Sequence, residues 1–466
     1  MIRPMASPLP VVGPSGADRT QISDPSTGEP AFEVARTPSG AVDEAMERAR
    51  AAQPAWDTLG ALGRAARLNA AADRVAADTS LADLIVADVG KPITEARAEV
   101  ARSAAILRFA ASLATAPLGE VYEDSTGAHI RVVRRPRGVA VLITPWNFPA
   151  AIPVWKLAPA LQAGNSVLLK PATQAARIAE RLVEHLELDD VVQLVPGGAA
   201  TANALLDAGP DAVSFTGSTN VGRQIAERLA GHFTALQLEM GGKNGVYVSE
   251  HADPEQAARI ALAGAMGYAG QKCTATSLLY VHESAAASVR DELMRQAAVL
   301  AVGDPRDPAT VVGPLIEIGK RDEVASELAD AGARGVRIES GGEALDRAGA
   351  FMAPAIVSGG PDDDPVHREE LFAPVLAVTE VAGMDDALAH LHAIPYGLVA
   401  GIVSPLREEI ERFARDVEAG IIRVNAPTTG VEPHVPFGGA KQSSFGPREQ
   451  GRAGLEFFSE TRTIYA

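Results

Sequence analysis

The sequence predicts an α/β fold in which a doubly wound parallel sheet is followed by a second α/β domain. Two observations support this prediction. Short apolar runs of strand length alternate with helical segments from residue 138 onward, and a second series of the same kind begins at Gly245. Such alternation is typical of parallel sheets with right-handed crossovers. A glycine-rich segment at residues 239–244 separates the two series, as expected where the chain crosses between domains.

Composition and charge narrow the class of protein. A chain of 466 residues is long enough for two or three domains, and 47% hydrophobic residues with 22% charged residues are typical of soluble globular proteins. The net charge of −17 argues against nucleic acid or an anionic membrane as the main partner. Residues 1–18 lack the apolar core of a signal peptide, and the longest apolar stretch, residues 138–155, is interrupted by prolines. We therefore expect a cytoplasmic protein.

The N-terminal region is predicted to be helical after a loose arm and a turn at residues 24–28. Apolar residues recur at spacings of three and four between residues 39 and 116. Ser39 is a candidate N-cap, Pro54 is expected to end the first helix, and residues 90–92 separate two later helices.

A strand is predicted at residues 129–135, which are rich in β-branched side chains and carry charges towards both ends. This pattern is typical of an exposed strand or of a strand at a subunit contact.

The first alternating series supplies five strands and four helices. The strands are expected at residues 139–144, 166–170, 191–195, 212–216 and 235–238, and the helices at residues 152–163, 174–186, 201–208 and 219–230. Ligands of doubly wound sheets bind beyond the carboxyl ends of the strands. The second series is expected to form strands at residues 245–248, 277–281, 374–379, 398–403 and 421–425, with helices that include residues 253–268, 285–301 and 408–418.

The only thiol of the chain, Cys273, cannot form an internal disulfide. It lies in the junction between a helical run and a strand, where functional residues often lie. Gly270 permits close approach of the backbone, and the cation of Lys272 would favour the thiolate unless its side chain points away from Cys273. A buried cysteine acting as a small hydrophobe is the alternative. The neighbouring residues favour a nucleophile.

A candidate anion site follows the fourth strand, although the common G-x-G-x-x-G turn of dinucleotide-binding proteins is absent. Residues 215–222 form a strand end that opens into a helix, and their backbone N–H groups could hold a pyrophosphate oxygen. An ordinary helix N-cap by Ser218 or Thr219 is the alternative.

Seven short motifs of the chain resemble those of the aldehyde dehydrogenase superfamily in order and approximate spacing. They are Pro-Trp-Asn-Phe-Pro at 145–149, Leu-Lys-Pro at 169–171, Phe-Thr-Gly-Ser at 215–218, Leu-Glu-Met-Gly-Gly-Lys at 238–243, Gly-Gln-Lys-Cys at 270–273, Glu-Leu-Phe at 370–372 and Pro-Phe-Gly-Gly at 436–439. The resemblance covers nearly the whole chain and implies an aldehyde dehydrogenase-like fold. Its implied parts are an NAD(P)-binding domain (residues 1–118 and 138–243), a catalytic domain (244–435) and a small β oligomerisation arm (119–137 and 436–466).

The resemblance also implies catalytic roles. Cys273 would attack the aldehyde carbon, and the side-chain amide of Asn147 with the backbone N–H of Cys273 would stabilise the resulting oxyanion. Glu239 would activate the water that hydrolyses the thioester. Lys156 matches a lysine of the family that could bind cofactor or pass protons. Considered alone, Asn147 resembles a turn residue, Glu239 a solvated carboxylate and Lys156 a surface residue with a snorkelling side chain.

NADP or NAD is the cofactor that the resemblance implies, and no metal site is expected. Lys170 is implied at the adenosine ribose, and Glu370 and Phe372 at the nicotinamide ribose and ring. Thr173 stands where strongly NAD-preferring members carry a glutamate. A hydroxyl does not repel a 2′-phosphate as a carboxylate does, so NADP is expected to be accepted. The full set of implied cofactor residues is Thr144, Trp146, Lys170, Thr173, Gly217, Ser218, Glu370 and Phe372.

The substrate is narrowed by residues 439–451, whose double serine and Pro-Arg-Glu-Gln-Gly run resemble 2-oxoglutarate semialdehyde (2,5-dioxopentanoate) dehydrogenases. Ala440 and Gln442 depart from that branch, so the reaction class is better defined than the substrate. A small carboxylated aldehyde is expected, and Arg102, on a helix that walls the tunnel in this family, is a candidate for binding its carboxylate. The family positions imply a substrate tunnel lined by Phe148, Trp155, Val431 and Phe437.

The sequence is also compatible with other functions. The same fold could act on a neutral aromatic or hydroxylated aldehyde. A non-catalytic protein is disfavoured by the intact set of Cys273, Asn147 and Glu239, and a cysteine hydrolase would need a base that no histidine motif suggests. A homodimer or homotetramer is implied, with strands at residues 128–135 and 457–464 crossing between subunits.

Overall fold

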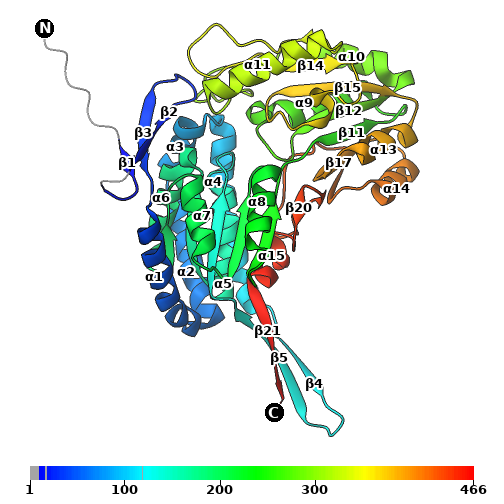
Figure 1. Cartoon of the computed structure of the whole chain (residues 1–466). Helices are drawn as coiled ribbons and strands as arrows, with labels where there is room; N and C mark the ends of the chain where they lie inside the picture. The colour runs from blue at the N-terminus through cyan, green and yellow to red at the C-terminus, as the bar shows by residue number, and fades with distance from the viewer. Residues whose placement is uncertain (1–9, 16–17, 118, 466) are drawn as a thin grey trace, which may run out of the picture.

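The computed structural model describes residues 10–15, 18–117 and 119–465. Most of the N-terminal arm expected at residues 1–18, and with it the signal-peptide prediction, lies outside the described residues. Two α/β units pack together, and a β arm projects away from both of them (Figure 1). None of the helices in the described part of the chain is both long and apolar enough to cross a bilayer.

The first unit contains a six-stranded sheet with the order β20-β10-β9-β6-β7-β8. The predicted strands and helices of this unit are present, and every boundary lies within two residues of its predicted position. The order reverses between β6 and β9, so a crevice is expected beyond the carboxyl ends of these two strands. The strands are β6 (Val139–Thr144), β7 (Ser166–Pro171), β8 (Val192–Leu194), β9 (Ala212–Thr216), β10 (Ala235–Glu239) and the antiparallel β20 (Ser444–Phe445). The helices are α5 (Ala151–Ala163), α6 (Ala176–Leu186), α7 (Ala199–Asp207) and α8 (Thr219–Leu229), and the 3₁₀ turn η2 (Thr173–Ala175) precedes α6.

The N-terminal helices complete this unit, with two corrections to the sequence-based expectation. Ser39 is the first residue of its helix, and Pro38 occupies the N-cap without a side-chain hydrogen bond. Pro54 lies inside that helix and does not end it, because Trp56 Nε1 donates to the carbonyl of Leu161 at 2.9 Å and holds the last turn in place. Such contacts offset the cost of an internal proline, about 3 kcal/mol. The elements are β1 (Val11–Val12), β2 (Arg19–Ser23), β3 (Pro30–Ala35), α1 (Ser39–Thr58), α2 (Gly60–Ala77), α3 (Ser80–Val89), α4 (Ile93–Ser112) and η1 (Leu113–Thr115).

The second unit is built on a seven-stranded sheet with the order β13-β14-β15-β12-β11-β17-β18, parallel except for β13. All five predicted strands are present, whereas β13 and β14 were not predicted because both are short and β13 is a polar edge strand. The strands are β11 (Asn244–Val248), β12 (Thr276–His282), β13 (Arg337–Ser340), β14 (Ala355–Ser358), β15 (Val375–Val381), β17 (Val399–Val403) and β18 (Ile421–Val424). The helices are α9 (Pro254–Met266), η3 (Gly267–Gly270), α10 (Glu283–Ala297), α11 (Ile318–Ala333), α12 (Pro365–Arg368), α13 (Met384–Ala393) and α14 (Arg407–Asp416).

The C-terminal segment contributes to all three parts of the molecule. Strand β19 (Ala440–Lys441) pairs with β16 (Tyr396–Gly397) of the second unit, β20 extends the first sheet, and α15 (Gly451–Phe457) packs on α5. Strand β21 (Ser459–Tyr465) joins β4 (Gly119–Glu123) and β5 (His129–Pro136) in the arm. Of the C-terminal residues 436–466, which were expected to serve oligomerisation, only β21 among the described residues lies in the arm (Figure 1).

Candidate active site

The loop that carries Cys273 connects η3 to β12. The last three residues of η3, directly before this loop, adopt left-handed backbone conformations, with φ of 53° at Tyr268, 52° at Ala269 and 68° at Gly270. A side chain at Gly270 would clash with the carbonyl oxygen of Ala373, so the close approach of these two segments requires glycine. Non-glycine residues in this conformation are strained, and such strain is concentrated in functional loops.

Two buried side-chain amides, those of Gln271 and Asn244, hold this loop in place. Gln271 accepts a hydrogen bond from the backbone N–H of Ile316 at 2.8 Å through Oε1. Asn244 donates from Nδ2 to the carbonyl of Cys273 at 2.8 Å and to the carbonyl of Ala275 at 2.9 Å. Asn244 was not identified from the sequence. The available signal was a polar side chain at the first position of a buried strand.

Cys273 lies between two cavities, and within the described residues it is the one residue that lines both. One cavity measures about 260 Å³ and opens towards helices α4 and α5. The other measures about 290 Å³ and lies beyond the carboxyl ends of β6 and β9, at the reversal of strand order. Cys273 therefore borders both cavities.

The cavity at the strand ends contains most of the residues expected to bind a dinucleotide. Trp146 and Phe372 meet edge to face, with ring centroids 5.6 Å apart. Ser218 caps α8 by accepting a hydrogen bond from the N–H of Val221 at 3.4 Å. The complete lining consists of Pro145, Trp146, Asn147, Thr216, Gly217, Ser218, Met240, Gly241, Cys273, Glu370 and Phe372.

The remaining expected cofactor residues, Thr144, Lys170 and Thr173, lie outside this lining but at the adjoining ends of β6 and β7. Burial lowers the pKa of Lys170 to about 8, and its Nζ donates to the carbonyl of Pro171 at 3.1 Å. Within the described residues no carboxylate forms an ion pair with Lys170, and the buried hydroxyls of Thr144 and Thr216 have no hydrogen-bond partner. These unpaired polar groups fit the hydroxyls and phosphates of a dinucleotide.

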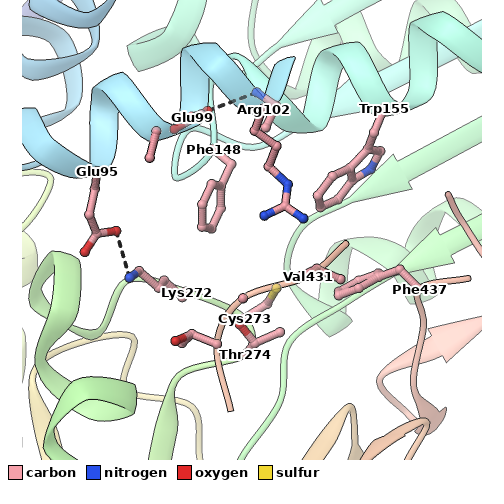
Figure 2. A pocket seen from close by; sticks show the side chains of 14 residues that line it. Glu95, Glu99, Arg102, Phe148, Trp155, Lys272, Cys273, Thr274, Val431 and Phe437 are labelled. Atoms are coloured by element: carbon pink, nitrogen blue, oxygen red, sulfur yellow. Dashed lines mark hydrogen bonds and ion pairs between the residues drawn. The ribbon is translucent and has the colours of Figure 1, made fainter. Parts of the chain in front are cut away.

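The pKa values of Glu370 and of the Cys273 thiol are both raised by burial. Burial raises the pKa of Glu370 to about 7, against the opposing hydrogen bond from the N–H of Gly242. Burial, followed by the carboxylates of Glu370, Glu239 and Glu449, raises the pKa of the Cys273 thiol. The expected thiolate-stabilising effect of Lys272 is wrong, because its ammonium pairs with Glu95 Oε2 at 2.7 Å (Figure 2).

The expected oxyanion donor, Asn147, is buried beside the Cys273 loop. Its Nδ2 donates to the carbonyl of Gln271 at 3.0 Å. An amide nitrogen carries two hydrogens, so one donor orients the side chain and the other remains for a ligand.

Glu239 and Lys156 lie outside both cavity linings, in a buried polar cluster behind the site. Glu239 Oε2 accepts from Ser444 Oγ at 2.6 Å, and burial followed by the charge of Glu449 raises the pKa of Glu239. Lys156 is 1% exposed and forms an ion pair with Glu449, so it is not a surface lysine. Ser444 and Glu449 were missed as site residues because the sequence shows them only as part of a C-terminal motif.

The cavity of about 260 Å³ beside α4 and α5 contains all four residues expected to form the substrate tunnel. Figure 2 shows Phe148 and Trp155 on either side of Arg102, with Val431 and Phe437 near Cys273. Its complete lining is Glu95, Ala98, Glu99, Arg102, Phe148, Ala151, Trp155, Lys272, Cys273, Thr274, Thr429, Gly430, Val431 and Phe437.

The chain is similar over most of its length to proteins of one family. The model of the Aldehyde dehydrogenase family matches residues 12–464. A 2,5-dioxopentanoate dehydrogenase of Saccharolobus solfataricus is 37% identical over 436 residues, which cover 91% of each chain. An alpha-ketoglutarate semialdehyde dehydrogenase of Haloferax volcanii is 39% identical over 399 residues, which cover 83% of this chain and 82% of the relative.

Solved structures share the fold over nearly the whole length. The crystal structure of PnpE in complex with nicotinamide adenine dinucleotide superimposes with a TM-score of 0.92 at 32% identity. The match covers 99% of this chain and 98% of PnpE.

Proposed function

The chain belongs to the aldehyde dehydrogenase family. We propose that it oxidises a small carboxylated aldehyde to the carboxylic acid with NADP or NAD as cofactor. The first candidate substrate is 2-oxoglutarate semialdehyde. The observation that carries this proposal is the position of Cys273 between two cavities. A nucleophile placed there can hold an aldehyde on one side while a dinucleotide occupies the other.

The residues of the chain supply attack, charge stabilisation and hydrolysis. The Cys273 sulfur, as thiolate, attacks the aldehyde carbon, and the free amide hydrogen of Asn147 with the backbone N–H of Cys273 stabilises the oxyanion. NAD(P), held by Trp146, Glu370 and Phe372, would supply the acceptor for the hydride of the aldehyde carbon, and Cys273 would then carry the acyl group as a thioester. Glu239, once deprotonated, takes a proton from the water that cleaves the thioester. The products are the carboxylic acid and the free thiol.

The buried polar groups behind Glu239 offer further acceptors for the proton that Glu239 takes from water. Lys156 and Glu449 form a buried ion pair, and Ser214 Oγ lies 2.8 Å from Lys156 Nζ. The charge of Glu449 disfavours ionisation of Glu239, so proton binding at one carboxylate depends on the other.

The cofactor residues fit either form of the dinucleotide. Trp146, Gly217, Ser218, Glu370 and Phe372 would hold the pyrophosphate and nicotinamide halves in the cavity, and Lys170 would lie towards the adenosine ribose. Thr173 Oγ1 donates to Gln174 Oε1 at 3.1 Å and brings no carboxylate to this edge. We therefore propose that NADP is accepted together with NAD.

The substrate class is supported by the two named relatives and by the motif at residues 439–451. A neutral aldehyde is the second candidate, because aromatic and aliphatic side chains form much of the tunnel wall.

We also propose a homodimer or homotetramer in which the arm contributes to the contact. Val121 and Tyr122 on β4 and Tyr465 on β21 are exposed. Strands β5 and β21 pair within one chain, from Ser459 opposite Pro136 to Tyr465 opposite Ile130, so the arm is complete before any association. Elution as a monomer from a sizing column would contradict the proposed homo-oligomer.

Within each chain we propose that residues 1–118 and 138–243 form the cofactor-binding domain and that residues 244–435 form the catalytic domain.

Absorbance at 340 nm tests the reaction directly. Wild-type protein with NADP or NAD and a panel of aldehydes should produce a signal that is largest with semialdehydes bearing a carboxylate. Cys273→Ala should abolish it. No signal from the wild type, or a full signal from Cys273→Ala, would contradict the mechanism.

A further inference from the structure

We propose that Arg102 binds the carboxylate of the substrate, with the indole N–H of Trp155 as a second donor. This inference rests on the proposed function and deepens it, because it assigns the specificity for an acidic aldehyde to one cation. Figure 2 shows the guanidinium of Arg102, which extends from α4 into the cavity that contains Cys273.

The Arg102 side chain is half-buried, and its guanidinium lacks a partner within the described residues. Its Nε and Nη2 are buried without a hydrogen bond, and no carboxylate lies within ion-pair distance of it in the described part of the chain. Burial lowers the pKa of Arg102, while the more distant charges of Glu432 and Glu99 oppose this effect. An unpaired buried cation is costly, so the cavity favours an anion at this position.

The other charged groups of the cavity are already neutralised. Glu95 pairs with Lys272, and Glu99 pairs with Lys91. Glu99 also accepts hydrogen bonds from the N–H groups of Ala150 and Ala151 at 2.9 and 3.0 Å. In the described lining, Arg102 is therefore the one charge left without a counter-charge.

The chemistry of the unpaired donors fits a carboxylate. The planar guanidinium presents parallel N–H donors that match the two oxygens of a carboxylate. Trp155 Nε1 is also buried without a partner in the same cavity. A neutral aldehyde would leave these donors unpaired, and this favours a substrate with the aldehyde at Cys273 and an acid group at Arg102.

Two aldehydes of equal chain length, 5-oxopentanoate and pentanal, separate the effect of the carboxylate from that of chain length. For Arg102→Met the ratio of kcat/KM values for 5-oxopentanoate over pentanal should fall about 10- to 100-fold, the range expected for lost hydrogen bonds to a charged group. Pentanal itself should become a better substrate because the wall is more apolar. Arg102→Lys should give an intermediate ratio.

Arg97→Met is the matched control, since Arg97 lies on the same helix, is exposed and does not line the cavity. It removes the same charge and should leave the ratio unchanged. Binding of glutarate, measured by calorimetry without cofactor, should be lost in Arg102→Met and kept in Arg97→Met.

The outcomes distinguish this inference from the proposed function. If wild type prefers 5-oxopentanoate and Arg102→Met keeps the same ratio and the same glutarate affinity, the inference fails and the proposed function stands. If wild type oxidises pentanal as well as 5-oxopentanoate, the proposed substrate class and the inference both fail. Absence of activity with every aldehyde would contradict the proposed reaction.

Discussion

The amide Nδ2 of Asn147 lies 3.0 Å from the backbone carbonyl oxygen of Gln271, two residues before Cys273. This hydrogen bond joins the end of β6 in the first unit to the cysteine loop of the second unit. It fixes the proposed oxyanion donor relative to the nucleophile without using both of its hydrogens.

Asn147→Ala should therefore lower kcat by about 10²- to 10³-fold, the loss typical of an oxyanion donor. It should also cost about 1–3 kcal/mol in the free energy of unfolding, because the buried carbonyl of Gln271 loses its donor. Steady-state kinetics and urea unfolding measure the two effects separately. A folded variant with less than about a threefold change in kcat would remove Asn147 from the mechanism, since even one ordinary hydrogen bond contributes more.

The reactivity of Cys273 without cofactor should increase with pH into the alkaline range. Because its thiol pKa is raised, the thiolate fraction is small at neutral pH, and alkylation by iodoacetamide should have an apparent pKa above the usual value of about 8.5. Glu370→Gln should lower that apparent pKa, since Glu370 contributes the largest carboxylate effect on the thiol. Glu369→Gln, at an exposed neighbouring position, is the control. Faster alkylation at neutral pH than that of a free thiol would contradict the prediction.

Glu449→Gln should move the acid limb of the deacylation profile to lower pH. Glu239 acts as a base only when deprotonated, and the charge of Glu449 raises its pKa. Removing this charge lowers the pKa of Glu239 and frees Lys156, which stabilises the Glu239 carboxylate further. Hydrolysis of p-nitrophenyl acetate passes through an acyl-cysteine without cofactor and measures this step. A shift to higher pH, or an unmoved limb, would be inconsistent with Glu239 as the base.

Ser444→Ala should move the same limb in the opposite direction. The 2.6 Å hydrogen bond from Ser444 Oγ stabilises the charged form of Glu239 and lowers its pKa. Its loss raises that pKa, so more alkaline solution is needed to reach half of the maximal rate. The neighbouring Ser443→Ala is unsuitable as a control, because Ser443 Oγ accepts from the N–H of Gly397. Opposite shifts in Glu449→Gln and Ser444→Ala would assign the limb to Glu239.

Thr173→Glu should lower kcat/KM for NADP at least about tenfold and retain activity with NAD, because a carboxylate at this edge repels a 2′-phosphate in low dielectric. Thr173→Val removes the hydroxyl without adding charge and should leave the NADP to NAD ratio close to that of the wild type. An equal decrease of kcat/KM with both cofactors in Thr173→Glu would show that residue 173 does not discriminate between a hydroxyl and a phosphate at the 2′ position of the cofactor.

Sequence reasoning placed five of the six strands of the first sheet, β6 to β10, within two residues because apolar runs and glycine-rich turns are local signals, but it did not predict the two-residue strand β20. It failed at Pro54, where a contact from Trp56 to a distant helix keeps the last turn of α1 intact. It also missed β13 and β14, whose short segments carry too little periodicity to distinguish strand from loop.

The sequence by itself determined the fold class, the family and Cys273 as the sole thiol, because these depend on residue identity and on order along the chain. Tertiary structure decided which groups surround that thiol. Ser444 lies 205 residues from Glu239, and Glu449 lies 293 residues from Lys156, yet each pair is in contact. Burial then set the charge states, raising the pKa of Cys273 and leaving the guanidinium of Arg102 unpaired. Desolvation depends on every element packed around a group, so no local motif could have shown it.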